Sequence, residues 1–573
     1  MKGKINLQTL RWLSEVTGKK KKYIPVLTVI QSVLGFSGVL YALFLRNIID
    51  SAVSGDRTGF DSGLAAILIL VTVQILLRAV CRHTEELSRS TFENQIKNRL
   101  FRTLTEKSFE QVDSVHSAEW MNRLTNDSAV CANALTEIIP GLAGMAVKLA
   151  AAVIMILALE PKFGCILVPG GLLMLFLTWI FRKTLKKLHK NIQEKDGLLR
   201  IYLQDILGSL LVVRSFAAEE QAVFSADEKM NAHQAARMKR NRFSNICNTG
   251  FSGAMNAMYL FGVGYGSYGI MCGTLSYGTL SALLQLISQI QSPFANITGY
   301  LPKYFAMTAS AERIMEAEKF ENGRTESVMS SGEIHDFYRS SFRSLRFENV
   351  CFTYTPPVFG DNADQKMPVV LKDINLEISK GEYAAFTGHS GCGKSTLLKL
   401  LMCLYKPDEG KISIVSDIEK PLTSQWQRMF AYVPQGNHIM SGSVREIISF
   451  PEPSESMDDD RIRRALEIAC ADFVFSLENG IDTVLGEGGQ GLSEGQIQRL
   501  AIARAVWSEN PVLILDEATS SLDEKSEESV LNNLRSMTDR TVIIVTHRPA
   551  ALNICDRIYS FDSSGHFILN QNQ

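Results

Sequence analysis

The sequence has no strong excess of charge of either sign. Its 573 residues include 59 Lys and Arg and 60 Asp and Glu, which give a formal net charge of −1 at pH 7. This balance gives no electrostatic reason to expect a nucleic-acid partner, and it gives no sign of a long solvating tail. We therefore expect that the protein binds no nucleic acid.

Cysteine is also scarce. Ten cysteines in a chain of this length are far too few for a disulfide scaffold. No two of them stand in a CxxC or Cys/His ligand spacing, so no metal site of that kind is expected. We expect most of them to be small buried hydrophobic residues in a reducing compartment.

Charge is missing from several long stretches within the first 305 residues. Residues 23–45 carry no charge over 23 residues, which is enough for a helix to cross a bilayer core. Residues 243–302 carry none over 60 residues, and a turn-like sequence at 272–278 divides them into two spans. The helices of a large soluble protein would not produce such a stretch. The sequence predicts six membrane-spanning helices, at about 23–45, 62–81, 138–159, 163–181, 250–272 and 277–302.

Basic residues set the expected orientation of these spans. Residues 1–22 contain seven Lys or Arg and one acidic residue, which places the N-terminus in the cytoplasm. The inner connections 78–137 and 182–242 are 60 and 61 residues long, and each is expected to form two helices that extend the spans. We predict their reversals near 116–122 and 205–216. Residues 1–320 would form the transmembrane domain, and the polar residues 321–345 a linker to a cytoplasmic domain at 346–573.

A phosphate-binding motif lies within this second domain. Residues 383–396 indicate a strand that runs into the pattern G-x-x-x-x-G-K-S and then into a helix. In such a loop the backbone N–H groups face phosphate oxygens, Lys394 reaches the β- and γ-phosphates, and the Ser395 hydroxyl ligates Mg²⁺. We predict that ATP is bound by Gly388, His389, Ser390, Gly391, Cys392, Gly393, Lys394, Ser395 and Thr396.

A second motif is an apolar strand that ends in two acidic residues, Asp516 and Glu517. A buried parallel strand delivers its last residues to the carboxyl edge of a sheet, where α/β proteins bind ligands. We predict that Asp516 holds the Mg²⁺ shell and that Glu517 acts as general base on the attacking water.

Residues 492–496, Leu-Ser-Glu-Gly-Gln, resemble the signature motif of ATP-binding cassette (ABC) proteins. Other segments agree with this resemblance. Tyr354 is similar to the aromatic residue that stacks on adenine, Gln435 to the Q-loop glutamine, and His547 to the switch histidine, while residues 521–523 are similar to the D-loop. Six spans before one cassette resemble an exporter-type ABC half-transporter. The implied fold is a six-helix all-α transmembrane domain joined to an α/β P-loop domain.

The resemblance also implies roles for individual residues. Gln435 would join Ser395 and Asp516 at Mg²⁺, and Gln435 and His547 would assist Glu517 in catalysis. ATP would lie between the P-loop of one chain and the signature motif of another, which assigns Ser493, Gly495 and Gln496 to the partner's nucleotide. One departure is Glu494, which stands where the family usually has glycine and is expected to point away from phosphate. Another is a polar insertion at 356–366, expected to be a surface loop.

Together these features predict a primary active transporter that works by alternating access and exports a small molecule, lipid, drug or peptide. An importer built on the exporter fold and an ATP-gated channel or regulator are alternatives, whereas the spans exclude a soluble ATPase.

Only 22 residues precede the spans, so no leader-peptide peptidase domain is expected. The chain keeps Lys394, Asp516, Glu517 and His547, so its own P-loop site is expected to hydrolyse ATP in either a homodimer or a heterodimer. The homodimer is favoured because Ser493 and Gly495 of the signature segment are retained. We expect an integral protein in contact with membrane lipid, in a bacterial inner membrane.

Two features bear on the transported substrate. Polar or small residues recur at helical spacing in the sixth span and could line a cavity or pack helices together. The residues of this polar stripe are Ser281, Gln285, Ser288, Ser292, Asn296 and Gly299. Lys148 lies near the middle of the third span, where a charge usually faces the bundle or water. It could favour anionic or polar substrates, or it could snorkel or pair with Gln285 for structural reasons.

Overall fold

The computed structural model describes residues 7–323, 326–354, 369–389, 391–436, 439–450, 458–537, 539–561 and 567–570. The chain forms two compact units. The helical unit comprises Met1–Arg99 and Arg123–Ile314, and the cassette unit comprises Leu100–Asn122 and Met315–Gln573. Residues Leu100–Asn122 therefore pack with the cassette although they lie within the helical half of the sequence.

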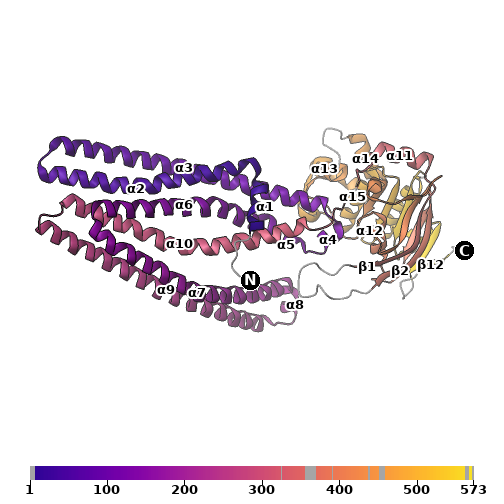
Figure 1. The fold of residues 1–573 in the computed structure, drawn as a ribbon. Coiled ribbons are helices and arrows are strands. Elements are labelled where there is room, and N and C mark those ends of the chain that lie inside the picture. The colour runs from indigo at the N-terminus through magenta and orange to yellow at the C-terminus, as the bar shows by residue number, and fades with distance from the viewer. Residues whose placement is uncertain are drawn as a thin grey trace. The chain divides into compact units, whose positions relative to one another are not determined.

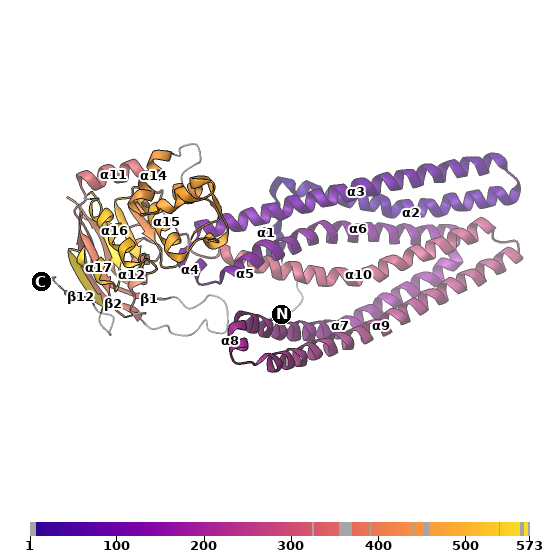
Figure 2. The same ribbon diagram turned by 180° about the vertical axis from the view of Figure 1, so that it is seen from behind.

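Long helices make up the helical unit (Figure 1). Two of them, α7 and α9, lie side by side along most of their length in both Figures 1 and 2. The helices are α1 (Leu7–Thr17), α2 (Tyr23–Ser54), α3 (Arg57–Glu106), α6 (Ser128–Leu159), α7 (Pro161–Gly208), α8 (Leu210–Ser215), α9 (Glu219–Met271) and α10 (Tyr277–Glu318).

Three helical segments of the described chain are long and apolar enough to cross a membrane: Leu7–Ser54, Arg57–Glu106 and Ser117–Leu159. The fifth expected span, in α9, is rich in glycine and tyrosine, which lowers its hydropathy. Parts of α7 and α10 have side chains outside the described residues. The count of six spans therefore stays a prediction.

A cluster of apolar side chains joins five helices of this unit. It contains Val39 of α2, Ile156 of α6, Phe163 of α7 and Leu286 of α10, with Tyr265 of α9 packed against it. Nearby, the carboxylate of Asp50 accepts hydrogen bonds from the Gly278 backbone N–H (2.8 Å) and the Ser276 hydroxyl (2.9 Å). This carboxylate satisfies a backbone donor at the start of α10, which no helical carbonyl can reach.

The two inner reversals lie close to where the sequence predicts them. The chain leaves α3 at Glu106 and passes through α4 (Phe109–Asp113) and α5 (Ser117–Asn122), so the first reversal begins about ten residues earlier than predicted. The second consists of the short helix α8 between the ends of α7 and α9.

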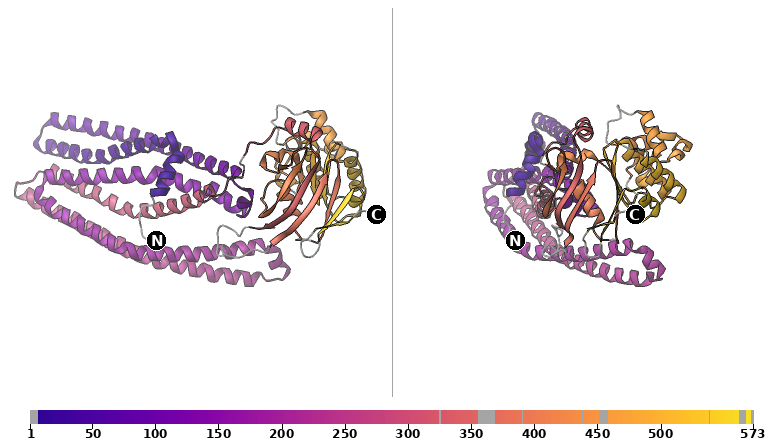
Figure 3. Two further views of the ribbon diagram at one scale, coloured as in Figure 1. Left: turned by 45° about the vertical axis from the view of Figure 1, so that its right-hand side comes forward. Right: turned by 90° about the vertical axis from the view of Figure 1, so that its right-hand side faces the viewer.

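Strands gather in the cassette unit, as the two views of Figure 3 show. They form a six-stranded sheet in the order β12-β11-β3-β10-β9-β6 and a four-stranded sheet in the order β2-β1-β4-β5. A short pair, β7 and β8, stands apart from both. The strands are β1 (Ser344–Thr353), β2 (Val369–Ser379), β3 (Tyr383–Thr387), β4 (Glu409–Val415), β5 (Lys420–Pro421), β6 (Phe430–Val433), β7 (Gly442–Ser443), β8 (Val484–Leu485), β9 (Val512–Asp516), β10 (Thr541–Val545), β11 (Arg557–Phe561) and β12 (Phe567–Asn570).

The central strands of the larger sheet are buried on both faces. In β3, Tyr383 and Ala385 belong to one apolar core, and Ala384 and Phe386 belong to the other. Successive side chains of a strand point to opposite faces, so a strand between two cores must be apolar throughout. Helices supply the rest of both cores: α11 (Ser331–Ser340), α12 (Lys394–Leu401), α13 (Val444–Ser449), α14 (Asp459–Ile468), α15 (Glu494–Trp507), α16 (Glu524–Arg535) and α17 (Pro549–Asn553).

The expectation of a polar linker at 321–345 was wrong for its second half. Helix α11 lies there, and its Ile334 and Tyr338 are buried in the core beneath the four-stranded sheet. Ser330 caps this helix and exchanges hydrogen bonds with Glu333, which satisfies donors at the helix start. The cassette fold therefore begins before β1.

Candidate nucleotide-binding site

Four predicted site segments follow four neighbouring strands of the six-stranded sheet. The P-loop follows β3, His547 follows β10, Asp516 ends β9 with Glu517 directly after it, and Gln435 follows β6. These strands are adjacent in the order β3-β10-β9-β6, and each neighbouring pair is parallel. Their carboxyl ends therefore meet at one edge, which brings together residues up to 159 positions apart (Gly388 to His547).

The P-loop has the backbone that its glycines predict. Gly391 and Gly393 have φ angles of 82° and 105°, in the left-handed region that favours glycine. A Cβ on Gly393 would also lie 2.6 Å from Leu371 Cδ2. Lys394 Nζ donates to the carbonyl oxygens of Gly388 and His389, the latter at 3.0 Å, so its ammonium group lies over the loop.

Three other P-loop residues differ in their surroundings. Cys392 is buried, with its thiol beneath the loop 3.7 Å from Lys394 Nζ, which makes its contribution a backbone one. The buried Thr396 pairs its hydroxyl with the hydroxyl of Tyr354 at 2.8 Å. His389 is exposed, and Ser390 lies outside the described residues.

Asp516, the last residue of β9, and Glu517, which follows it, have different environments. Asp516 is 2% exposed, and its carboxylate accepts hydrogen bonds from the Tyr432 hydroxyl (3.1 Å) and from Ser395. Burial raises the pKa of Asp516 above its ordinary value, although these two hydrogen bonds act in the opposite direction. Glu517 instead accepts a hydrogen bond from Gln435 Nε2 at 2.7 Å.

The residues predicted for Mg²⁺ offer oxygen ligands. Ser395 and Asp516 are already hydrogen-bonded to each other. Gln435 uses its Nε2 on Glu517, which leaves the amide oxygen as its ligand atom. A hydroxyl, a carboxylate and an amide oxygen are the ligand types that Mg²⁺ prefers, so the residues present fit this ion.

The signature segment begins helix α15. Ser493 caps the helix and exchanges hydrogen bonds with Gln496, so both side chains order its N-terminus. Gly495 packs tightly, because an added Cβ would lie 2.8 Å from the Ser521 carbonyl oxygen. Glu494 is exposed at the first turn and accepts a hydrogen bond from the Ser521 hydroxyl at 3.4 Å.

Comparison with known proteins agrees with this geometry. Residues 24–294 match the family model of the ABC transporter transmembrane region, and residues 371–520 match the ABC transporter family model. The chain belongs to the ABC transporter family. Its layout, a helical transmembrane region followed by one ATP-binding cassette, is that of an exporter-type half-transporter.

Relatives of this transporter differ in length and in name. It is 29% identical over 492 residues to the ABC transporter B family member 1 of Dictyostelium discoideum, covering 85% of this chain but only 52% of that protein. It is 26% identical to a multidrug resistance ABC transporter ATP-binding and permease protein of Lactococcus lactis, covering 92% and 87%. A leukotoxin translocation ATP-binding protein of Mannheimia glucosida is 26% identical, covering 96% and 75%.

A solved structure of a bacterial Atm1-family ABC exporter with ATP bound shares the transporter's fold. Its TM-score is 0.75 at 20% identity, and the likeness covers 95% of this chain and 94% of that one. These comparisons give the importer alternative no support.

The structure adds a contact to the transporter's cassette that sequence reasoning missed. The carboxylate of Asp113, in α4, accepts hydrogen bonds from Lys399 Nζ (3.3 Å) and from the Tyr405 hydroxyl (3.1 Å). Burial raises the pKa of Tyr405 to about 12, so this hydroxyl stays protonated and donates. The Phe109 ring packs on the same tyrosine, with 6.2 Å between ring centroids.

Tyr405 joins this contact to the predicted adenine site. Its ring stacks on Phe352 at 5.4 Å and meets Tyr354 edge-on at 5.7 Å. Tyr354 in turn is hydrogen-bonded to Thr396 of the P-loop helix. A continuous set of contacts thus runs from α4 to the nucleotide-binding loop within the cassette unit.

Among the described residues, the predicted substrate residues Lys148, Gln285 and Ser288 are not brought together in one cavity. Lys148 lines a cavity in the helical unit, whereas Gln285 and Ser288 are not among the described residues that line it. Ser288 instead donates to the Gln285 carbonyl oxygen within α10. The side chains of Ser292 and Asn296 lie outside the described residues.

Proposed function

We propose that this transporter hydrolyses ATP at the carboxyl edge of its six-stranded sheet and uses that reaction to export a substrate. The observation that supports it most directly is the set of parallel strands that gathers Lys394, Asp516, Glu517, Gln435 and His547 at one sheet edge. Bound Mg²⁺ would neutralise phosphate charge beside Ser395, Asp516 and Gln435.

The position of each of these side chains supports a specific role in ATP binding or hydrolysis. Lys394 binds the β- and γ-phosphates with the ammonium group that now lies over the loop carbonyls. Glu517 takes a proton from the attacking water, and Gln435 orients the Glu517 carboxylate through its 2.7 Å hydrogen bond. His547, exposed at the end of β10, contacts the γ-phosphate.

The α4 contact transmits this reaction to the membrane helices. Replacing Asp113 with alanine removes the acceptor for Lys399 and Tyr405 and leaves the residues of the nucleotide site intact. We expect Asp113→Ala to keep at least about half of the ATP hydrolysis while substrate moved per ATP falls about tenfold, a loss equal to one charge-assisted hydrogen bond. Parallel ATPase and transport assays in proteoliposomes measure both quantities.

The graded control for this contact is Asp113→Asn, which still accepts from Tyr405 but loses the charge that faces Lys399. It should give an intermediate coupling ratio. Equal loss of hydrolysis and transport in Asp113→Ala would contradict a transmitting role.

We propose that the working transporter is a homodimer. Its own P-loop site keeps Lys394, Asp516, Glu517 and His547, while its signature helix forms no hydrogen bond with that P-loop in the described part of the chain. Expressed alone and purified, the protein should have the mass of a dimer and hydrolyse ATP with a Hill coefficient above 1. An inactive or monomeric product would indicate a missing partner chain.

We propose export from the cytoplasm across a bacterial inner membrane, with the N-terminus and the cassette on the cytoplasmic side as the basic residues before the first span predict. The names of the relatives, which refer to multidrug resistance and toxin translocation, suggest the range of cargo. ATP-dependent uptake into inverted membrane vesicles tests the direction, and uptake into right-side-out vesicles would contradict it.

A further inference from the structure

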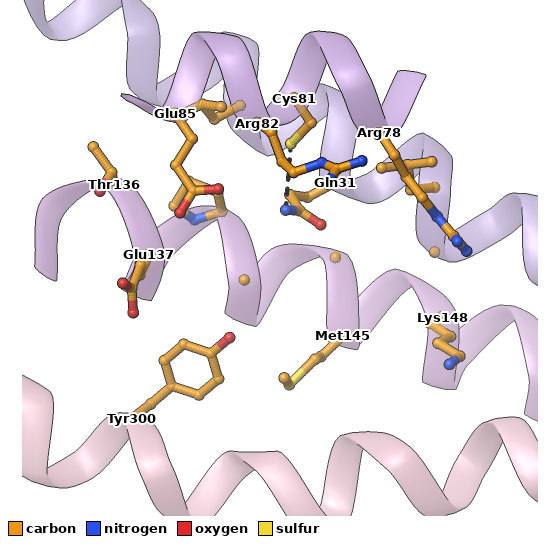
Figure 4. Close-up of a pocket in the computed structure, with 16 residues that line it drawn as sticks. Gln31, Arg78, Cys81, Arg82, Glu85, Thr136, Glu137, Met145, Lys148 and Tyr300 are labelled. Atoms are coloured by element: carbon orange, nitrogen blue, oxygen red, sulfur yellow. Dashed lines mark hydrogen bonds between the residues drawn. The ribbon is translucent and has the colours of Figure 1, made fainter. Parts of the chain in front are cut away.

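The helical unit contains a cavity of about 690 Å³ between α2, α3, α6 and α10. That volume lies within the range of cavities that bind small organic molecules, roughly 300–1,000 Å³. Figure 4 shows the side chains that line it. Both the polarity of this lining and its charge bear on what the cavity accepts.

The charges in the cavity are separated along its length. Arg78 and Lys148 lie at one end, Glu85 and Glu137 at the other, and the Arg82 guanidinium points from between them toward the Arg78 end (Figure 4). Arg78 and Lys148 are close enough to interact electrostatically. Because like charges repel, holding them at one end of a cavity favours a ligand that supplies negative charge there.

The acidic end is already compensated by other residues. Arg89 lies 3.4 Å from a Glu85 oxygen and 3.7 Å from a Glu137 oxygen, and Lys303 also pairs with Glu137. These carboxylates therefore have cationic partners other than Arg78 and Arg82. Among the described residues, Arg78 and Arg82 form no ion pair.

The rest of the lining is largely apolar. It includes Leu27 and Leu34 of α2, Pro140 and Met145 of α6, and the Tyr300 ring of α10. These groups offer contact to a hydrocarbon or aromatic body, whereas the guanidinium groups offer paired donors to a carboxylate, phosphate or sulfonate.

We propose that this cavity binds an anionic amphiphile, with its acidic group toward Arg78, Arg82 and Lys148 and its apolar body along α2 and α6. The proposal rests on the transport function proposed above and names the substrate class. It also gives Lys148 a site that it shares with two arginines, neither of which the sequence pattern singled out.

Two xanthene dyes of similar size and opposite charge test the proposal, carboxyfluorescein (anionic) and rhodamine 123 (cationic). Fluorescence anisotropy measures their binding to the full protein in phosphatidylcholine nanodiscs, with empty nanodiscs as the blank. We expect carboxyfluorescein to bind about tenfold more tightly or better, and we expect Arg78→Gln with Arg82→Gln to remove that preference. Equal binding of the two dyes, or a preference that persists in the double variant, would overturn the proposal.

Two further variants separate charge from folding. Arg78→Lys with Arg82→Lys keeps both charges and should keep most of the preference. Arg57→Gln removes a charge from the first residue of α3, roughly 30 Å along the helix from Arg78, and should change nothing. If the glutamine double variant does not fold, the wild-type protein and the lysine variant still test the proposal. Equal wild-type affinities for the two dyes, or loss of the preference in the lysine variant, would contradict a charge-based site.

Added phosphatidylglycerol distinguishes the two sources of an anionic amphiphile. If it competes with carboxyfluorescein, the ligand is a lipid headgroup; if it does not, the ligand is a soluble organic anion. Nucleotide is not needed for this binding assay, so its outcome is separate from that of ATP hydrolysis. A hydrolysing protein without dye preference would overturn the cavity proposal alone, and a selective protein without hydrolysis would overturn the proposed function alone.

Discussion

Replacing Glu517 with glutamine is expected to lower steady-state ATP hydrolysis by about 10²–10⁴-fold, the usual contribution of a general base, while ATP binding survives. The amide keeps the shape of the side chain but cannot take a proton from water. The P-loop contacts of Lys394 and the buried Asp516 do not involve Glu517 directly, so binding should remain. Phosphate release and equilibrium binding of labelled ATP measure the two effects on the same preparation.

A matched control comes from the following helix. Glu524 is exposed in the first turn of α16, and Glu524→Gln makes the same chemical change outside the predicted nucleotide site. It should leave hydrolysis unchanged. Near-normal turnover by Glu517→Gln would show that another group is the base.

The residues proposed for the nucleotide site could be singled out from the sequence because each belongs to a short motif, although the motifs themselves are far apart in the chain. A glycine-rich turn after an apolar strand, and an apolar strand that ends in two acids, each report their own local structure. The sequence did not reveal that Gln435 donates to Glu517 or that Tyr432 donates to Asp516, because those bonds depend on β6 lying beside β9. Strand order is a tertiary property that no local pattern specifies.

The sequence could not predict the contact at Asp113 for the same reason. Asp113 and Lys399 are 286 residues apart, and neither lies in a motif with its own signal. Helix α11 is a different case, since its capping pattern at Ser330 and Glu333 is visible in the sequence. The apolar face behind that cap is only a few residues long, and such a short face is easily taken for a polar connection.

The cavity shows that a periodic pattern in one helix does not identify the residues that line a cavity. A polar stripe on the sixth expected span predicts that one face differs from the others, but it does not say what that face meets. In the structure, Gln289 on a neighbouring face of α10 packs against α2 and donates to the Gly38 carbonyl oxygen at 2.5 Å. Cations on α3 and α6 line the cavity instead, and only the packing of four helices brings them together.

A buried ion pair in the helical unit gives the second large expected effect. Asp127, just before α6, is fully buried and accepts two hydrogen bonds from the Arg313 guanidinium at 2.8 and 2.5 Å and one from Ser310 at 2.8 Å. Arg313→Met would leave this carboxylate buried without its cation. We expect the free energy of unfolding to fall by about 3 kcal/mol, the lower end for a broken buried pair, because Ser310 still donates.

The double variant Asp127→Leu with Arg313→Met separates the pair's net contribution from the cost of an uncompensated charge. Removing both charges is often nearly neutral, so the double variant should regain most of the stability lost by Arg313→Met alone. Arg102→Met breaks the ion pair with Glu106, in which both side chains are more than half exposed. This variant should lower the free energy of unfolding much less than Arg313→Met does. Unfolding by denaturing detergent compares all three, and equal losses in Arg313→Met and Arg102→Met would show that the burial of Asp127 does not govern the stability of this contact.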